Sequence, residues 1–110
     1  MATSTYMVQF TYTSEAWATM IQKPQDRSIP SQELVQRLGG RLLSLYYALG
    51  AYDGVALIEV PDDITASAVN LAVKASGIMK VNEVTRLFTM SEGMEAMRKA
   101  AGGAFAVPTA

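Results

Sequence analysis

Residues 41–60 read RLLSLYYALGAYDGVALIEV, two apolar runs on either side of a turn that contains two glycines. Bulky apolar residues flanking a short glycine-containing loop are typical of two antiparallel strands joined as a β-hairpin. Neither run has a clearly polar side, because apolar residues occupy both sets of alternate positions. We therefore expect both faces of the sheet that contains this hairpin to be covered.

Two further strands are predicted from alternating side chains, one over residues 5–12 and one over residues 81–90. The first has four apolar or aromatic residues on one face and more polar neighbours on the other. Together with the hairpin, these segments predict a sheet of four strands.

A helical region is predicted between the first strand and the hairpin. Ser14 can cap its beginning, because a serine side chain accepts a hydrogen bond from a free amide of the first helical turn. Prolines interrupt the helix somewhere between Pro24 and Pro30, and a second piece ends at Leu38. The glycine pair 39–40 that follows favours the left-handed backbone that ends a helix.

Two more helices are predicted after the hairpin. Residues 61–63, Pro-Asp-Asp, begin the first of them, because aspartate bonds free amides and complements the helix dipole. This helix is expected to end at Gly77. A short last helix is predicted from a Ser91 cap to about Ala101.

The order strand, helix, strand, strand, helix, strand predicts an α+β fold with the ferredoxin-like arrangement, a four-stranded antiparallel sheet with helices on one face. We assign residues 1–101 to this domain and residues 102–110 to a C-terminal tail. Half of the chain is apolar and only 17% is charged, which is low for a small monomer. We expect a second copy to cover the helix-free face, giving a homodimer; whether dimers assemble further is left open.

Charge and residue usage exclude several function classes. Nine basic and ten acidic residues give a net charge of −1, so the chain has no overall field to attract a nucleic acid. Without cysteine or histidine, the chain cannot use thiol or imidazole catalysis, or hold zinc or haem through those residues. No metal or cofactor is expected. No apolar run is long enough to span a membrane, and we expect a cytoplasmic protein.

The string LGAYDGVALIEVPDD, residues 49–63, resembles the GYD domain family of small bacterial proteins. LGGRL at residues 38–42 and KPQDR at residues 23–27 add to the resemblance, which extends from about residue 6 to residue 97.

One feature departs from that family. Ala51 stands directly before Tyr52, where the family name implies glycine, and the glycine lies one position earlier, at Gly50. The resemblance implies a dimeric α/β-barrel, in which two ferredoxin-like sheets pack face to face. It implies no particular reaction.

Tyr52 and Asp53 are the candidate catalytic residues. Placed beside one ligand, the phenol can donate a hydrogen bond and the carboxylate can accept a proton. The alternative is structural, with Asp53 bonded to turn amides and Tyr52 packed over the end of the hairpin. Glu59, Asp62 and Asp63 supply oxygen atoms, but helix capping explains both aspartates without a metal.

We expect a ligand pocket formed by Trp17, Tyr46, Tyr52, Asp53 and Arg86. Aromatic residues on strands are also typical of an ordinary core or a dimer interface. If Arg86 is buried it needs a partner, and Glu59 and Glu83 are available. Candidates for an anion-binding group are Arg27, Arg37, Arg41 and Arg86.

Two functions remain open at this point. The first is a protein or cofactor-independent enzyme that binds a small aromatic or quinone-like molecule; the second is a non-catalytic dimerisation or ligand-sensing module. A cavity lined by Tyr52 and Asp53 favours the first. A filled core with Tyr52 turned to solvent favours the second.

Overall fold

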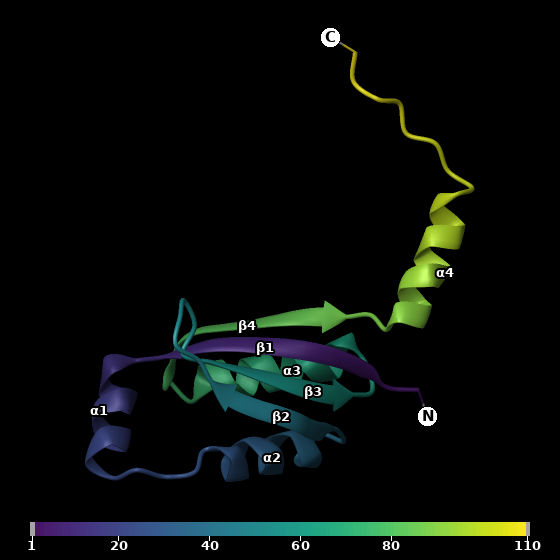
Figure 1. Ribbon diagram of the computed structural model, residues 1–110. Helices are drawn as coiled ribbons and strands as arrows, with labels where there is room; N and C mark the ends of the chain where they lie inside the picture. Colours follow the sequence, from purple (N-terminus) through teal and green to yellow (C-terminus); the bar gives the residue numbers. More distant parts are fainter. Residues whose placement is uncertain (1, 110) are drawn as a thin grey trace.

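A computed structural model describes residues 2–109 of the chain (Figure 1). The elements, in chain order, are β1 (Ser4–Tyr12), α1 (Ser14–Gln22), α2 (Ser28–Arg37), β2 (Arg41–Tyr47), β3 (Gly54–Val60), α3 (Asp63–Ala75), β4 (Met79–Leu87) and α4 (Met90–Ala100).

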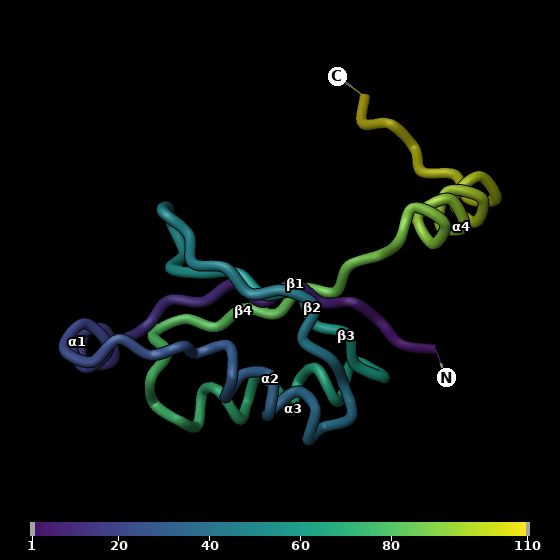
Figure 2. Tube along the Cα trace, turned by 60° about the horizontal axis from the view of Figure 1, so that its bottom comes forward, coloured from purple at the N-terminus to yellow at the C-terminus, as the bar shows by residue number. Residues whose placement is uncertain are grey.

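The four strands form one antiparallel sheet in the order β2-β3-β1-β4. This order and the α+β composition confirm the predicted ferredoxin-like fold. Helices α2 and α3 cover one face of the sheet, which we call the covered face, whereas α1 lies beyond one end of the sheet (Figures 1 and 2). The opposite side is the helix-free face.

The core lies between the covered face and the two helices. Side chains alternate along β1, so Tyr6, Val8, Phe10 and Tyr12 are all buried, whereas the residues between them are only half-buried. Strand β3 alternates in the same way, and its Val60 is fully buried. The core also includes Ala56, Ile58, Val35, Ala66 and Val69.

A register shift between Leu42 and Ser44 changes which side chains of β2 share a face. Strict alternation predicts that Leu42 and Leu45 lie on opposite faces. The structure instead places Leu42 opposite Ile58 and Leu45 opposite Ala56, and both leucines pack against the core. The physical reason is a β-bulge, in which an extra residue in one strand reverses the alternation.

The predicted helices are present, but two of them are capped by a different residue from the one predicted. The side chain of Thr13, rather than Ser14, caps α1. Thr89, rather than Ser91, caps α4, because Thr89 and Glu92 form a reciprocal capping box. This cap ends the preceding strand earlier than predicted, at Leu87.

The predicted helix stops and the cap of α3 are confirmed. Gly39 and Gly77 have φ angles of +87° and +78°, the left-handed conformation that glycine adopts at low cost. The Asp62 carboxylate accepts a hydrogen bond from the Thr65 amide at 2.8 Å and caps α3 as expected. Its hydrogen bonds with Thr65 hold the pKa of Asp62 below its ordinary value.

Helix α4 projects from the sheet on the helix-free side and has no buried residue (Figures 1 and 2). The radius of gyration is 17.6 Å, whereas a compact domain of this length has a radius of about 13 Å. Residues 103–109 continue beyond α4 without helix or strand. Within residues 2–109, no helix is both long and apolar enough to cross a membrane.

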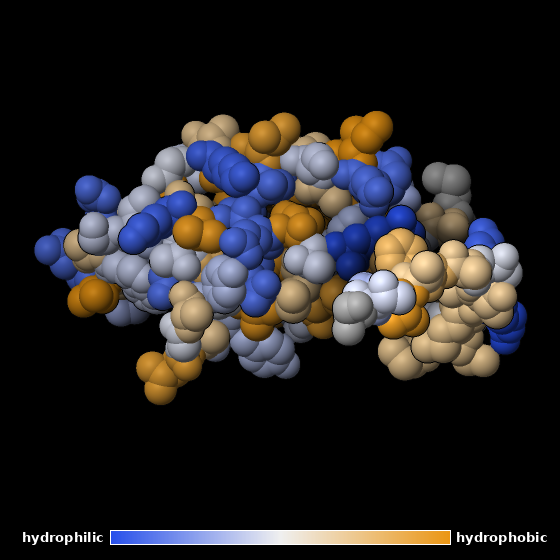
Figure 3. Space-filling view, turned by 90° about the horizontal axis from the view of Figure 1, so that it is seen from above, coloured by the Kyte–Doolittle hydropathy of each residue, from blue (hydrophilic) through white to orange (hydrophobic). Residues whose placement is uncertain are grey.

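The helix-free face is more polar than the sequence pattern predicts. Figure 3 shows hydrophilic and hydrophobic side chains mixed over this side of the molecule. Strand pairing places Met7 and Leu57 opposite one another on it, but also brings together Gln9 and Glu83. Polar partners therefore occupy part of the surface that we expected a second copy to cover.

Candidate functional site

Asp53 fastens the hairpin turn to the end of β1 and to α1. Its backbone amide donates a hydrogen bond to the Phe10 carbonyl at 2.8 Å. Its carboxylate Oδ2 accepts two hydrogen bonds of 2.9 Å, from the Tyr12 amide and from the Trp17 indole Nε1. The carboxylate thus joins three segments of the chain.

Tyr52 lies on the other side of the sheet. Its hydroxyl donates to the Glu83 carboxylate at 2.7 Å. Glu83 belongs to the helix-free face, because its neighbours in β4, Asn82 and Val84, line the cavity or pack against the core. The hydrogen bond to Glu83 is the main reason that the pKa of Tyr52 is raised above 10.0. The structure therefore does not bring the Tyr52 phenol and the Asp53 carboxylate together.

Trp17 belongs to an aromatic cluster at the end of the sheet next to α1. The centroid of the Tyr12 ring lies 5.0 Å from that of Trp17 and 5.3 Å from that of Phe10, both with edge-to-face geometry. The Tyr47 ring adjoins both Tyr12 and Trp17, and the hydroxyl oxygens of Tyr12 and Tyr47 are 3.4 Å apart. Burial raises the pKa of Tyr12 well above its ordinary value, so its hydroxyl stays protonated at neutral pH.

Arg86 lies near the opposite end of the sheet. Its partner is Asp63, at 3.8 Å, rather than Glu59 or Glu83, and its guanidinium lies 5.0 Å from the centroid of the Phe88 ring. The Asp63 carboxylate also accepts a hydrogen bond from the Tyr6 hydroxyl. Burial, followed by this bond, raises the pKa of Tyr6.

The five predicted pocket residues thus occupy separate places. Trp17 and Asp53 lie together, Arg86 lies with Asp63, and Tyr46 and Tyr52 lie toward the helix-free side. Tyr46 pairs with Val55 and is 66% exposed. Binding roles for these residues stay predictions.

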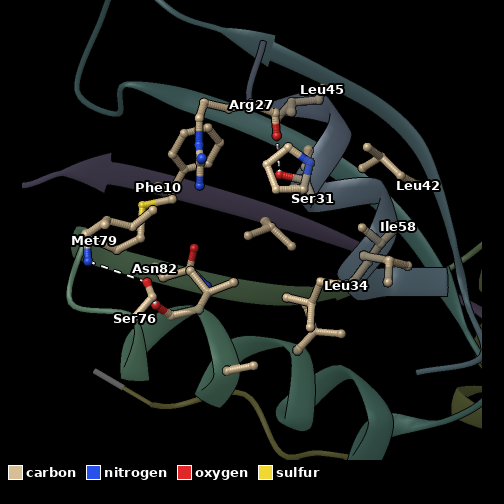
Figure 4. Close-up of a pocket in the computed structure, with 18 of the residues that line it drawn as sticks. Phe10, Arg27, Ser31, Leu34, Leu42, Leu45, Ile58, Ser76, Met79 and Asn82 are labelled. Carbon is tan, nitrogen blue, oxygen red and sulfur yellow. Dashed lines mark hydrogen bonds between the residues drawn. The ribbon is translucent and has the colours of Figure 1, made fainter. Parts of the chain in front are cut away.

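A cavity of about 180 Å³ opens between the covered face and helices α2 and α3 (Figure 4). Its floor is formed by strand residues and its walls by the two helices. Figure 4 shows Leu34, Leu42 and Ile58 at one end, with Phe10 and Arg27 at the other. Its lining is mostly apolar: Val8, Phe10, Tyr12, Pro30, Leu34, Val35, Leu42, Leu45, Ala56, Ile58, Val69, Ala72, Val73, Ile78 and Met79.

Polar groups are few in this cavity. Ser31, Ser76, Asn82 and Arg27 line it. The buried amide of Asn82 donates a hydrogen bond to Asn70 at 2.9 Å, so that group is satisfied within the protein.

Arg27 occupies a particular position among these groups. It is half-buried and borders two further cavities, of about 160 Å³ and 280 Å³, as well as the first. Its guanidinium donates a hydrogen bond to the neutral side chain of Gln25 at 3.3 Å. The arrangement supplies an apolar chamber with one positive charge at its border.

The size of the chamber limits its occupants. An apolar cavity of about 150 Å³ is known to hold benzene, whereas sites for drug-sized ligands span about 300–1,000 Å³. The observed 180 Å³ therefore suits a single ring or a short alkyl chain. Within residues 2–109, no three acidic side chains gather as a metal site would require.

From the sequence, Arg27 is only one of four arginines that could bind an anion, and no pattern indicates that Ser31, Ser76 and Asn82 line a cavity. One signal was available, because Arg27 lies in the predicted break between two helical pieces, where a loop residue can turn toward the sheet. Tyr12 was assigned to the correct strand face, but its part in the cavity was not predicted.

Comparison with known proteins identifies the family of the chain. The chain matches the model of the GYD domain over residues 6–97, as the motifs around the hairpin predict. It is also similar to the "Glutamine synthetase and cystathionine beta-lyase binding protein" of Thermus thermophilus. The identity is 30% over 76 residues, which cover 69% of this chain and 80% of the relative.

Proposed function

The chain belongs to the GYD domain family, and on that premise we propose that it is a binding protein for a small, mostly apolar molecule. The cavity between the covered face and helices α2 and α3 carries this proposal. Sites for small molecules are typically apolar chambers with a few polar groups that orient the ligand. A single-ring aromatic or quinone-like compound has the size and character that this lining suits.

Binding without catalysis fits the surroundings of the candidate base. Asp53 accepts hydrogen bonds from two protein donors and does not line the cavity. Tyr52 is hydrogen-bonded to Glu83 on the other side of the sheet. We therefore propose a ligand-sensing role in preference to an enzymatic one, and a cytoplasmic location stays a prediction of the sequence.

A cavity-filling variant tests the binding proposal. Ala56 forms part of the cavity floor, whereas Ala66 lies in the same core and does not line the cavity. Ala56→Leu should fill empty space without loss of stability, and calorimetric titration with benzyl alcohol or hydroquinone should show binding to the wild type and none to the variant. Ala66→Leu, the matched control, should lower the free energy of unfolding by about 1–3 kcal/mol, because it overpacks a filled region. Equal titration curves for wild type and Ala56→Leu would contradict the proposal.

We also propose that two copies associate through the helix-free face. Half-buried apolar side chains such as Met7 and Leu57 lie there among polar ones. Interfaces between separately folded proteins have this mixed composition. The family resemblance points to the same sheet-to-sheet arrangement. Light scattering after size-exclusion chromatography should give twice the mass of the chain, and a single-chain mass at micromolar concentration would contradict the dimer.

A second candidate function is the binding of a protein partner. Met90, Met94 and Met97 lie at helical spacing on α4 and are 84%, 51% and 71% exposed. Flexible methionine side chains adapt to varied protein surfaces. The relative in Thermus thermophilus is named for binding two enzymes, one of which is glutamine synthetase. Purified glutamine synthetase from the organism that encodes this chain is therefore the partner to test. Its binding should be lost in Met94→Glu and kept in Glu95→Gln, which alters the polar side of α4.

A further inference from the structure

We infer that the ligand of the cavity is a small carboxylate, whose apolar part enters the chamber and whose anionic group pairs with Arg27. This inference rests on the proposed binding function and adds the chemical class of the ligand. Three observations carry it: the lack of an acidic partner for Arg27 within residues 2–109, its place at the border of the cavity, and the size of the apolar chamber.

Arg27 combines half-burial with the lack of an acidic partner within residues 2–109; Arg37 also has no ion pair there, but it is exposed. Ion pairs within residues 2–109 join Arg41 to Glu59, Arg86 to Asp63 and Arg98 to Glu95, and none of them includes Arg27. The three paired arginines are exposed at the surface, whereas Arg27 is half-buried beside apolar side chains. Taking a guanidinium partly out of water without a counter-charge is unfavourable, so an anion beside it gains more than it would at an open surface.

The carboxylate of the preceding residue, Asp26, does not form an ion pair with Arg27 in the described part of the chain. Asp26 accepts hydrogen bonds from the amide and the hydroxyl of Ser28, at 2.9 Å and 2.6 Å. These bonds hold the pKa of Asp26 below its ordinary value and keep the carboxylate at the first turn of α2. The guanidinium and this carboxylate are not within ion-pair distance in the described part of the chain.

The position of Arg27 sets how a ligand would lie. Arg27 and Phe10 lie at one end of the chamber, and Leu34, Leu42 and Ile58 at the other (Figure 4). A carboxylate at Arg27 therefore directs an attached ring or short chain toward the leucine end. The outer cavity of about 160 Å³, which also borders Arg27 and has no acidic residue in its lining, leaves room for the oxygen atoms of the carboxylate. The Tyr12 side chain also lines this part of the cavity, and its hydroxyl oxygen lies 3.4 Å from that of Tyr47.

Benzoate and benzyl alcohol test this inference as a charged and a neutral compound of similar size. Calorimetric titration of the wild type at neutral pH should give an affinity for benzoate about tenfold or more above that for benzyl alcohol, since hydrogen bonds to charged groups are worth that factor. Arg27→Gln should remove this preference, so that benzoate binds no more tightly than benzyl alcohol. Arg27→Lys, which keeps the charge but loses the planar fork, should keep part of the preference. Arg37→Gln, on the exposed end of α2, is the matched control and should behave as the wild type.

The outcomes separate the inference from the function on which it rests. Equal affinities for the two compounds, unaltered by Arg27→Gln, would overturn the pairing with Arg27 and leave the apolar binding site intact. Absence of binding by both compounds to a folded wild type would overturn the inference and the proposed function together. Thermal unfolding of each variant, measured without ligand, shows whether a lost affinity comes from a lost fold.

Discussion

The two faces of the sheet differ in what covers them and in what they offer to another molecule. On the covered face, Tyr6, Val8 and Ile58 are buried beneath α2 and α3, and the packing leaves a chamber of about 180 Å³. On the helix-free face, apolar side chains such as Leu57 alternate with charged ones such as Glu83, and no helix covers them (Figures 2 and 3). One face is therefore a core with a cavity, and the other is a surface of mixed polarity.

Because of this difference, neighbouring residues in one strand can serve different functions. Successive side chains of a strand point to opposite faces. A substitution on one face should therefore alter stability or ligand binding, and a substitution at the next residue should alter association.

The largest effect is expected from the pair Ile58 and Leu57. Ile58 is 2% exposed, and Ile58→Ala should lower the free energy of unfolding by about 2–5 kcal/mol. Leu57→Ala should cost roughly 1 kcal/mol, because this side chain is only half-buried in the single chain. Urea denaturation of the two variants measures the difference. Equal losses would show that the two faces are packed alike.

Self-association of the chain should depend on the helix-free face, whereas stability depends mainly on the covered face. Leu57→Glu places a charge on the helix-free face and should weaken self-association by about 100-fold or more, since an unpaired charge in an interface costs several kcal/mol. Sedimentation equilibrium measures this change, and circular dichroism should show a retained fold. Gln36→Glu adds the same charge on the exposed side of α2 and should not alter association. A Leu57→Glu variant that still forms dimers would place the interface elsewhere.

Asp53 and Tyr52 form the next pair. Asp53→Ala leaves the Tyr12 amide and the Trp17 indole without their acceptor and should cost about 1–3 kcal/mol. The emission of Trp17 should shift as α1 loosens from the hairpin. Tyr52→Phe removes only a hydrogen bond to an exposed carboxylate and should alter stability little. If Tyr52→Phe proved the more damaging, the assignment of these side chains to opposite faces would be wrong.

The smallest effect concerns the ionisation of tyrosines on the two faces. The bond to Glu83 raises the pKa of Tyr52 above 10.0, and burial raises that of Tyr12 much further. A raised pKa favours the protonated, folded form. Its contribution to stability is complete below about pH 10 and is lost as the pH rises through the folded pKa. In a titration followed by NMR of labelled tyrosine, Tyr52 should ionise before Tyr12, and Glu83→Gln should bring the pKa of Tyr52 back toward its ordinary value.

The strands and helices could be predicted because their signals are local. Alternation along β1, the glycines at helix ends and the aspartate cap of α3 all depend on residues a few positions apart. The separation of Tyr52 from Asp53 depends instead on the bend between β2 and β3, in which Tyr52 bonds to Glu83 and Asp53 bonds to Tyr12 and Trp17. The expectation of one shared ligand did not take this into account.

Other features depend on packing between distant segments and could not be predicted. The bulge after Leu42 reverses a face only when β2 is paired with β3. The chamber exists because α2 and α3 do not fill all the space above Ala56 of β3, and the volume of that space cannot be predicted from any single segment. Which arginine becomes half-buried beside it is likewise decided by tertiary structure.

A methyl NMR spectrum of the labelled protein is the sharpest test of whether the two faces serve two separate kinds of binding. Addition of benzoate should move the signals of Leu34 and Leu45, which line the chamber. Dilution should move those of Met7 and Leu57, which lie on the helix-free face. We predict two sets of signals with no common member. A single set that responds to both changes, or no response of Leu34 and Leu45 to benzoate, would contradict the division between the faces.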